Sequence, residues 1–199
     1  MKKFFATVMY CCVVAFPLMV SAQEQKPNVI YILADDLGYG DVGYNGQELI
    51  ETPELDELAR NGMRFTNHYC GNAVCAPSRA SLLMGQHPGH AYIRSNSPGY
   101  PDGQTPIPAD SETLGKLMQR AGYKTACIGK WGLGSFHDTG NPNKQGFDYF
   151  YGYTDQVLAH NYYPKYLWQN GIKQFLENGN GKQNDYSHDL FTAEAISFI

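Results

Sequence analysis

The sequence has no excess of basic residues and few charged residues of either sign. Charged residues make up 17% of its 199 residues, and 15 Lys and Arg stand against 19 Asp and Glu, for a formal charge of −4. Nucleic-acid-binding domains usually carry a basic patch or stripe, so no nucleic-acid partner is expected. Internal repeats and low-complexity tracts are missing as well, which excludes repeat architectures. With 43% hydrophobic residues, the chain has the composition of a globular domain.

Long hydrophobic runs are missing everywhere except at the N-terminus. Two lysines there precede an apolar run over residues 4–20, and Val20-Ser21-Ala22 provides small residues suited to a signal-peptidase cleavage site. This pattern predicts a secretory signal over residues 1–22 that is removed to leave Gln23 first, with a formal charge of −6. An uncleaved anchor is the alternative, but these small residues favour cleavage over stable membrane insertion. We therefore expect an exported protein, either periplasmic or secreted.

Cysteine is scarce, and its count is odd in the predicted mature chain. Two of the five cysteines lie in the signal, which leaves Cys70, Cys75 and Cys127. These three thiols cannot all pair within one chain. Either one disulfide accompanies a buried free cysteine, or one cysteine has a chemical task.

Residues 29–34 form a continuous apolar, β-branched run that ends at two acidic residues, Asp35 and Asp36. The run predicts a strand covered on both faces, as in a parallel sheet. Ligands in open α/β sheets bind outside the carboxyl ends of the strands. Asp35 and Asp36 could hold a hard divalent cation there, or they could form a plain polar turn.

Two helices are predicted from start and stop signals. The first has Thr52 as its N-cap, Pro53 at its first position and Gly62 beyond its end. The second runs from an N-cap at Ser111 to a stop at Gly122 and precedes a strand-like run over residues 124–128. A helix followed by a buried strand is typical of α/β folds.

Two further segments follow from composition and spacing. Residues 95–109 are rich in Gly, Pro, Ser and Asn, which predicts a surface loop with the potential to line a substrate cleft. Residues 187–199 have helical spacing and no stop signal, so the chain is expected to end inside a helix.

The most specific pattern is Cys75-Ala76-Pro77-Ser78-Arg79, followed by Leu83-Met84-Gly85. It resembles the sulfatase signature Cys-x-Pro-Ser-Arg with its following Leu-x-Gly. Residues 27–40 resemble the opening strand and metal-binding Asp pair of that family, and residues 52–62 resemble its first helix. Residues 129–134, Gly-Lys-Trp-Gly-Leu-Gly, resemble its catalytic lysine loop. Four blocks in the family order make the resemblance specific.

The resemblance implies that Cys75 is oxidised by a maturation enzyme to formylglycine, whose hydrated aldehyde is a geminal diol. One hydroxyl would attack the sulfur of an aryl or carbohydrate sulfate ester, and the other would lose its proton to expel the sulfate. One divalent metal, by resemblance Ca²⁺, would be held by Asp35, Asp36 and residue 75. Arg79 and Lys130 would stabilise the diol and the charge that develops during transfer. Without the resemblance, Arg79 could pair locally on its helix, and Lys130 could be a solvated lysine at a strand end.

The implied fold is an alkaline-phosphatase-like α/β sandwich, with a mostly parallel sheet and helices on both faces. Residues 23–199 would form only the N-terminal portion of its catalytic domain. Because further metal ligands and catalytic groups would come from the C-terminal portion, we expect the N-terminal portion alone to be inactive.

The lysine loop departs from the family at one position. Many sulfatases have histidine in contact with the formylglycine where this sequence has Gly132. That contact is either absent or supplied elsewhere, and His137 and His160 are candidates. His160 lies in an aromatic-rich stretch over residues 147–168, where it could hydrogen-bond a sulfate or a sugar hydroxyl. Aromatic rings can stack on sugars, but an aromatic cluster of this size is more often part of a core or an interface.

Two other functions fit the same residues. A formylglycine-dependent phosphonate or phosphate ester hydrolase would use the same signature and metal site. An exported glycan-binding protein would use the aromatic stretch and leave Cys75 unmodified.

Overall fold

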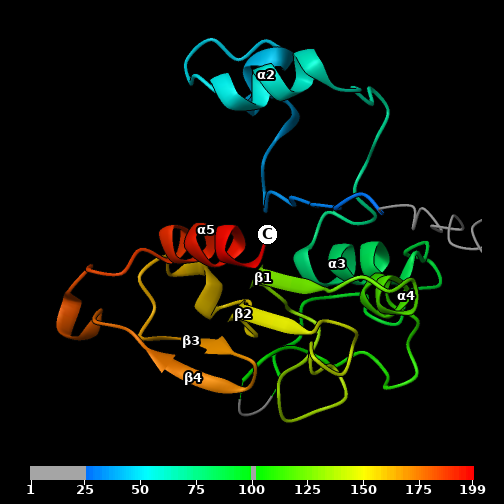
Figure 1. The fold of residues 1–199 in the computed structure, drawn as a ribbon, viewed down its shortest axis with the longest axis vertical. Helices are drawn as coiled ribbons and strands as arrows, with labels where there is room; N and C mark the ends of the chain where they lie inside the picture. Colours follow the sequence, from blue (N-terminus) through cyan, green and yellow to red (C-terminus); the bar gives the residue numbers. More distant parts are fainter. Residues whose placement is uncertain (1–25, 100–101) are drawn as a thin grey trace, which may run out of the picture.

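The computed structural model describes residues 26–99 and 102–199, so the predicted signal over residues 1–22 and the predicted start at Gln23 lie outside the described residues. The α-helices are α2 (Pro53–Asn61), α3 (Cys75–Met84), α4 (Leu114–Arg120) and α5 (Ser187–Phe198). The strands are β1 (Ala126–Lys130), β2 (Tyr149–Tyr153), β3 (Tyr166–Gln169) and β4 (Ile172–Phe175). Short 3-10 turns are η1 (Tyr39–Asp41), η2 (Gly43–Asn45), η3 (Leu158–His160) and η4 (Gly179–Gly181) (Figure 1). In this part of the chain, no helix has the length and apolar character needed to cross a membrane.

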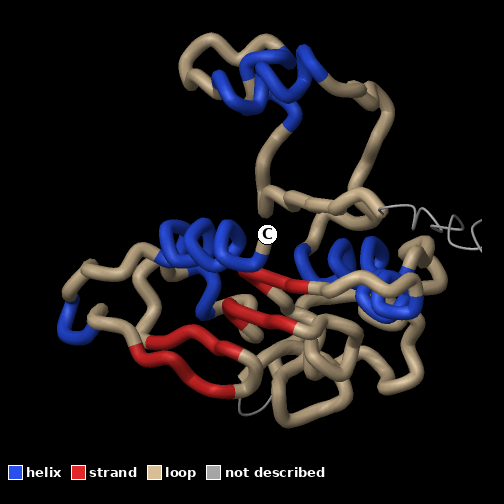
Figure 2. Tube along the Cα trace, viewed as in Figure 1, coloured by secondary structure: helices blue, strands red, loops and turns tan. Residues whose placement is uncertain are grey.

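The four strands form one sheet in the order β1-β2-β3-β4 (Figure 2). β1 and β2 are parallel, and their ladder runs from Ala126 opposite Tyr149 to Lys130 opposite Tyr153. The β2–β3 and β3–β4 pairs are antiparallel. The predicted α/β class is confirmed, and in the described residues the parallel arrangement is limited to β1 and β2.

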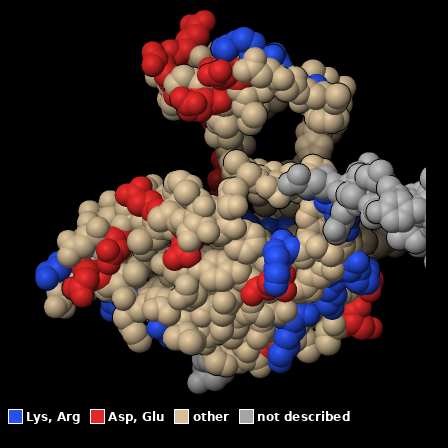
Figure 3. All heavy atoms as spheres, in the orientation of Figure 1, with Lys and Arg blue, Asp and Glu red and all other residues tan. Residues whose placement is uncertain are grey.

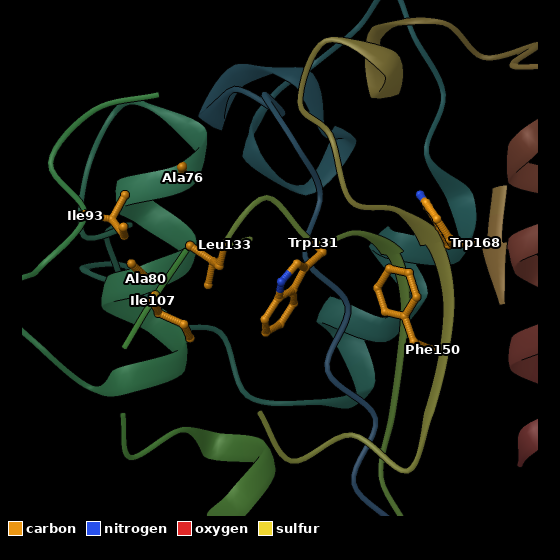
Figure 4. Close-up of a cluster of buried hydrophobic side chains, with 8 residues drawn as sticks. All are labelled: Ala76, Ala80, Ile93, Ile107, Trp131, Leu133, Phe150 and Trp168. Carbon is orange, nitrogen blue, oxygen red and sulfur yellow. The ribbon is translucent and has the colours of Figure 1, made fainter. Parts of the chain in front are cut away.

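The core lies between α3 and the sheet. Trp131 and Leu133, from the segment after β1, meet Ala76 and Ala80 of α3 on one side and Phe150 of β2 on the other (Figure 4). A second cluster joins β2 to Leu167 of β3 and to apolar residues of α5. The aromatic stretch therefore supplies core residues, since Phe150, Tyr151, Tyr153 and Trp168 are all buried.

The helix predictions hold, with one corrected start. α2 begins after Thr52 and ends before Gly62, as predicted, and α5 covers the expected C-terminal segment. The second predicted helix, α4, is capped by Thr113 and not by Ser111. Thr113 Oγ1 accepts a hydrogen bond from Lys116 N at 3.2 Å and donates one to Gln145 O at 2.6 Å. Ser111 N instead donates to Pro108 O at 3.1 Å, in the turn before the helix.

The strand predicted over residues 29–34 is wrong for the described structure. The segment is not assigned to any strand, and its apolar side chains are exposed; Val29 is 63% exposed and Ile32 is 83% exposed. A strand needs a partner edge for its backbone groups, and an apolar run alone does not supply one.

The predicted surface loop over residues 95–109 is partly buried. Among its described residues the only strand-like pairing is an isolated bridge between Pro98 and Gln104. Gln104 and Ile107 are nevertheless buried. Ile107 N donates to Leu133 O at 3.1 Å, so the loop is fastened to the segment that follows β1.

The region around α2 stands away from the sheet (Figure 1). Among the helices, strands and 3-10 turns, α2 makes its main contacts with η2, and none of its residues is buried. Its Leu58 is 66% exposed. Acidic side chains gather over this region (Figure 3), with Glu54 and Asp56 in the first turn of the helix.

Candidate active site

Lys130 is the last residue of β1, and the buried residues after it fix its place. Trp131 is 1% exposed, and Leu133 is fully buried. Trp131 N donates to Tyr153 O at 2.9 Å, and Trp131 Nε1 donates to Gly140 O at 2.7 Å. The lysine loop, residues 129–134, is thus anchored in the core at the carboxyl end of a parallel strand, where α/β folds bind ligands.

Arg79 connects α3 to the lysine loop. It lies four residues after Cys75, the first residue of α3, and so on the same side of the helix. Its Nη1 donates to Lys130 O at 2.5 Å, and its Nη2 lies 3.3 Å from Asp35 Oδ1. Arg79 therefore joins three separate chain segments and does not pair locally on its own helix.

Asp35 forms ion pairs with both Arg79 and Lys130. Lys130 Nζ lies 2.6 Å from its Oδ2, while Arg79 approaches its other oxygen. Burial acts to raise the pKa of Asp35, but the hydrogen bond from Lys130 and the charges of Arg79 and Lys130 outweigh it, so the pKa is lowered. Asp35 is therefore held ionised, which is the form that binds a cation.

Asp35, Asp36 and Cys75 could hold a metal together. One ligand atom from each lies within 4.8 Å of the others. Asp36 has a φ of 62°, a left-handed conformation that is costly for a residue with a side chain and is often found at functional sites. Carboxylate oxygens suit Ca²⁺, whereas a thiol suits softer metals. The donor set therefore fits Ca²⁺ better if residue 75 carries oxygen in place of sulfur.

The start of α3 is capped from a distant loop. Val74, its N-cap residue, makes no side-chain capping bond. Ala76 N instead donates to Asn96 Oδ1 at 2.9 Å. Sequence reasoning missed Asn96, because nothing distinguishes it from other polar residues of its loop. Its contact fixes the turn of helix that carries Cys75.

The thiols do not pair with one another, since Cys70, Cys75 and Cys127 are all free. Cys127 packs against the core, and burial raises the pKa of its thiol to about 12. The described cysteines form no disulfide, so the explanation that combined one disulfide with a buried free cysteine does not apply to them. Cys75 is the one that lies beside two carboxylates.

The two candidate histidines lie on other segments of the chain than these site residues. His160 is exposed at the end of η3, and the ring of His137 packs against Trp168 at a centroid distance of 5.9 Å. Within the described residues, neither makes a side-chain hydrogen bond to Asp35, Cys75 or Lys130. A hollow beside His137 is lined by Ala109, Asp138, Thr139 and Lys144, and thus by other residues than those of the site.

A family model and several known proteins match the chain. The family model described as Sulfatase matches residues 27–199. The chain belongs to the sulfatase family. Human arylsulfatase G is 42% identical over 139 residues, which cover 70% of this chain and 26% of that protein. The chain thus spans about a quarter of the length of this curated sulfatase.

Solved structures extend the comparison to the fold. The crystal structure of Ps i-CgsB is 33% identical, with a TM-score of 0.72, over 87% of this chain and 41% of that chain. A structure described as in complex with its substrate D-Glucosamine-2-N, 6-O-disulfate is 32% identical, with a TM-score of 0.68, over 87% of this chain and 31% of that chain. The predicted alkaline-phosphatase-like fold is thereby confirmed for this chain.

Proposed function

We propose that the full-length protein hydrolyses aryl or carbohydrate sulfate esters, with a formylglycine made from Cys75 as its nucleophile. The observation that carries this is the convergence of five side chains. Asp35 and Asp36 approach Cys75, while Arg79 and Lys130 both pair with Asp35. The carbohydrate substrate class is supported by the solved relative whose description names a glucosamine disulfate as its substrate.

The carboxylates would hold Ca²⁺ together with an oxygen of the modified residue 75. Ca²⁺ at this point would supply a Lewis acid that draws charge from a sulfate oxygen. Formylglycine would supply a hydroxyl nucleophile in place of the thiol. For its formation, Cys75 must meet a maturation enzyme, and its partly exposed position at the first residue of α3 is compatible with that.

Arg79 and Lys130 would stabilise the negative charge that grows on the sulfate oxygens. Their side chains are only 12% and 9% exposed, so water screens them little. Each contacts Asp35 and so starts in a fixed position. A cation that is positioned before the reaction lowers the barrier without reorganising during it.

His160 stays a candidate for binding the sulfate or a sugar hydroxyl of the substrate, since it is exposed at the end of η3. Export and cleavage after Ala22 remain part of the proposal, because an exported hydrolase would meet extracellular sulfated glycans. The N-terminal sequence of the exported protein tests cleavage, and a chain that keeps Lys2 and Lys3 would refute it.

The test compares 4-nitrophenyl sulfate with 4-nitrophenyl phosphate as substrates of the full-length protein and its Cys75→Ala variant. We expect turnover of the sulfate by the wild type and none by the variant. Faster turnover of the phosphate would favour the phosphate ester hydrolase instead. Glycan binding that survives chelation and Cys75→Ala, with no turnover of either ester, would favour the glycan-binding protein.

A further inference from the structure

Gly132 of the lysine loop has a close neighbour that the sequence did not indicate. Its φ is +75°, and a Cβ built on it would lie 1.9 Å from Gln156 Nε2 and 2.8 Å from Gln156 Cδ. These distances are far shorter than any van der Waals contact. A side chain on residue 132 and the present position of Gln156 are therefore mutually exclusive. The amide of Gln156 takes the space that a side chain on residue 132 would fill.

The Gln156 amide is buried without a partner. The residue is 3% exposed, and neither Nε2 nor Oε1 has a hydrogen-bond partner among the described residues. Thr154 is 1% exposed, and its Oγ1 likewise has no partner in that part of the chain. Buried polar groups are nearly always hydrogen-bonded, so two unpaired side chains only two residues apart need an explanation. If Gln156 only filled space, an apolar side chain of similar shape would do so without the desolvation cost.

Both unpaired groups come shortly after the carboxyl end of a parallel strand, the end at which α/β folds bind ligands. They follow β2, which ends at Tyr153, and Tyr153 is paired with Lys130 at the end of the parallel strand β1. The carboxyl ends of β1 and β2 therefore present Lys130, Thr154 and Gln156 at one edge of the sheet. Lys130 in turn contacts Asp35, which lies beside Cys75.

We propose that Gln156 is a further catalytic residue, whose amide nitrogen donates a hydrogen bond to an oxygen of the sulfate group bound between residue 75 and Lys130. This inference rests on the proposed sulfatase function. Gln156 then supplies the hydrogen bond that residue 132 cannot make. An amide does not titrate between pH 5 and 8, whereas histidine does, so the contribution of Gln156 is independent of pH in that range.

The decisive variant is Gln156→Met, which keeps the approximate length and shape of the side chain and removes both polar atoms. We expect the kcat/KM of the full-length protein for 4-nitrophenyl sulfate to fall by roughly 10²-fold, the usual loss of one oxyanion donor. The melting temperature should stay equal or rise, because an unpaired buried amide is lost. Gln145→Met is the matched control, since Gln145 is also buried but donates to Pro108 O and Thr139 O. That variant should melt earlier and keep its kcat/KM.

A second variant moves the polar side chain from position 156 to position 132. Gly132→His combined with Gln156→Gly makes room for an imidazole, and histidine tolerates positive φ better than most residues. We expect it to regain part of the activity lost in Gln156→Gly, with a new pH dependence near pH 6.5. Wild-type kcat/KM in Gln156→Met, or an exchange variant with no gain over Gln156→Gly, would overturn the inference.

A binding measurement separates this inference from the proposed function. In a Cys75→Ala background, calorimetry gives the affinity for 4-nitrophenyl sulfate with and without Gln156→Met. Weaker binding with Gln156→Met supports the inference even if the wild-type protein hydrolyses no ester. Equal affinity overturns it, even if the wild-type protein is an active sulfatase.

Discussion

The lysine loop and the α2 region differ in how the chain holds them. Residues 129–134 are fixed by buried Trp131 and Leu133, by backbone hydrogen bonds and by the contact with Arg79. α2 has equally clear helix signals in its sequence, yet all its residues are partly or fully accessible and it stands apart from the sheet (Figure 1). Local signals suffice to form a helix, whereas the proposed catalytic groups lie where core packing holds several segments together.

Asp35 lies between these two extremes. The apolar run before it is exposed, so packing does not hold it in place. Its position comes instead from Arg79 and Lys130, which approach its two carboxylate oxygens. The contrast predicts large effects for changes at the lysine loop, smaller ones at Asp35 and the smallest in α2.

The largest effect on stability is expected for Trp131→Ala. Removing a fully buried tryptophan costs about 3–5 kcal/mol, because contacts are lost and the cavity closes only in part. Chemical denaturation of the full-length protein measures this free energy of unfolding. A loss below about 0.5 kcal/mol, typical of surface changes, would mean that the core does not anchor the loop.

The next largest effect is expected for Lys130→Ala, and it concerns activity. If the ammonium meets charge that grows in the transition state, kcat should fall by roughly 10²–10³, or about 2.7–4 kcal/mol. Steady-state kinetics with 4-nitrophenyl sulfate measure it. Lys124→Ala removes the same charge from the exposed position just before β1 and should leave kcat unchanged. A change confined to KM in Lys130→Ala would indicate uniform substrate binding instead.

A smaller and pH-dependent effect is expected for Asp35→Asn. The pKa of Asp35 is lowered from its ordinary 3.8, so its ionised form stabilises the folded state. That contribution is fully present above pH 3.8 and is lost as the pH falls through the lower folded pKa. Melting temperatures of the wild type and the variant should therefore differ most near neutral pH and converge in acid.

Asp110→Asn is the control, because Asp110 is exposed and forms no salt bridge with another described residue. Its melting curve should follow that of the wild type at every pH. The Asp35 variant should also bind less Ca²⁺ by calorimetry, since one charged oxygen ligand is lost. A constant difference in melting temperature down to strong acid would contradict the ion-pair account.

The smallest effect is expected for Leu58→Ala in α2. The side chain is 66% exposed, and leucine and alanine are both good helix formers, so stability should change by less than about 0.5 kcal/mol. The same denaturation experiment as for Trp131→Ala gives this value. A loss of about 2 kcal/mol or more, as for a buried leucine, would show that α2 packs against another surface in the full-length protein.

The features that the sequence predicted correctly are those with local signals. α2, α5 and the Cys75 motif are recognised from neighbouring residues, and the core role of the aromatic stretch follows from its composition. The failures all depend on distant partners. Thr113 caps α4 because Gln145 fixes it, Asn96 caps α3 from 20 residues away, and residues 29–34 pair with no strand edge. Gln156 was missed for the same reason, since only the folded chain brings it against Gly132.

The most direct test of the central proposal is mass spectrometry of the peptide that spans Cys75 to Arg79. The protein should be made at full length in cells that contain a maturation enzyme, and its activity on 4-nitrophenyl sulfate measured on the same sample. We predict the mass of formylglycine or its hydrate at position 75, and an activity proportional to the converted fraction. Fully active protein that carries an alkylatable thiol at position 75 would contradict the account.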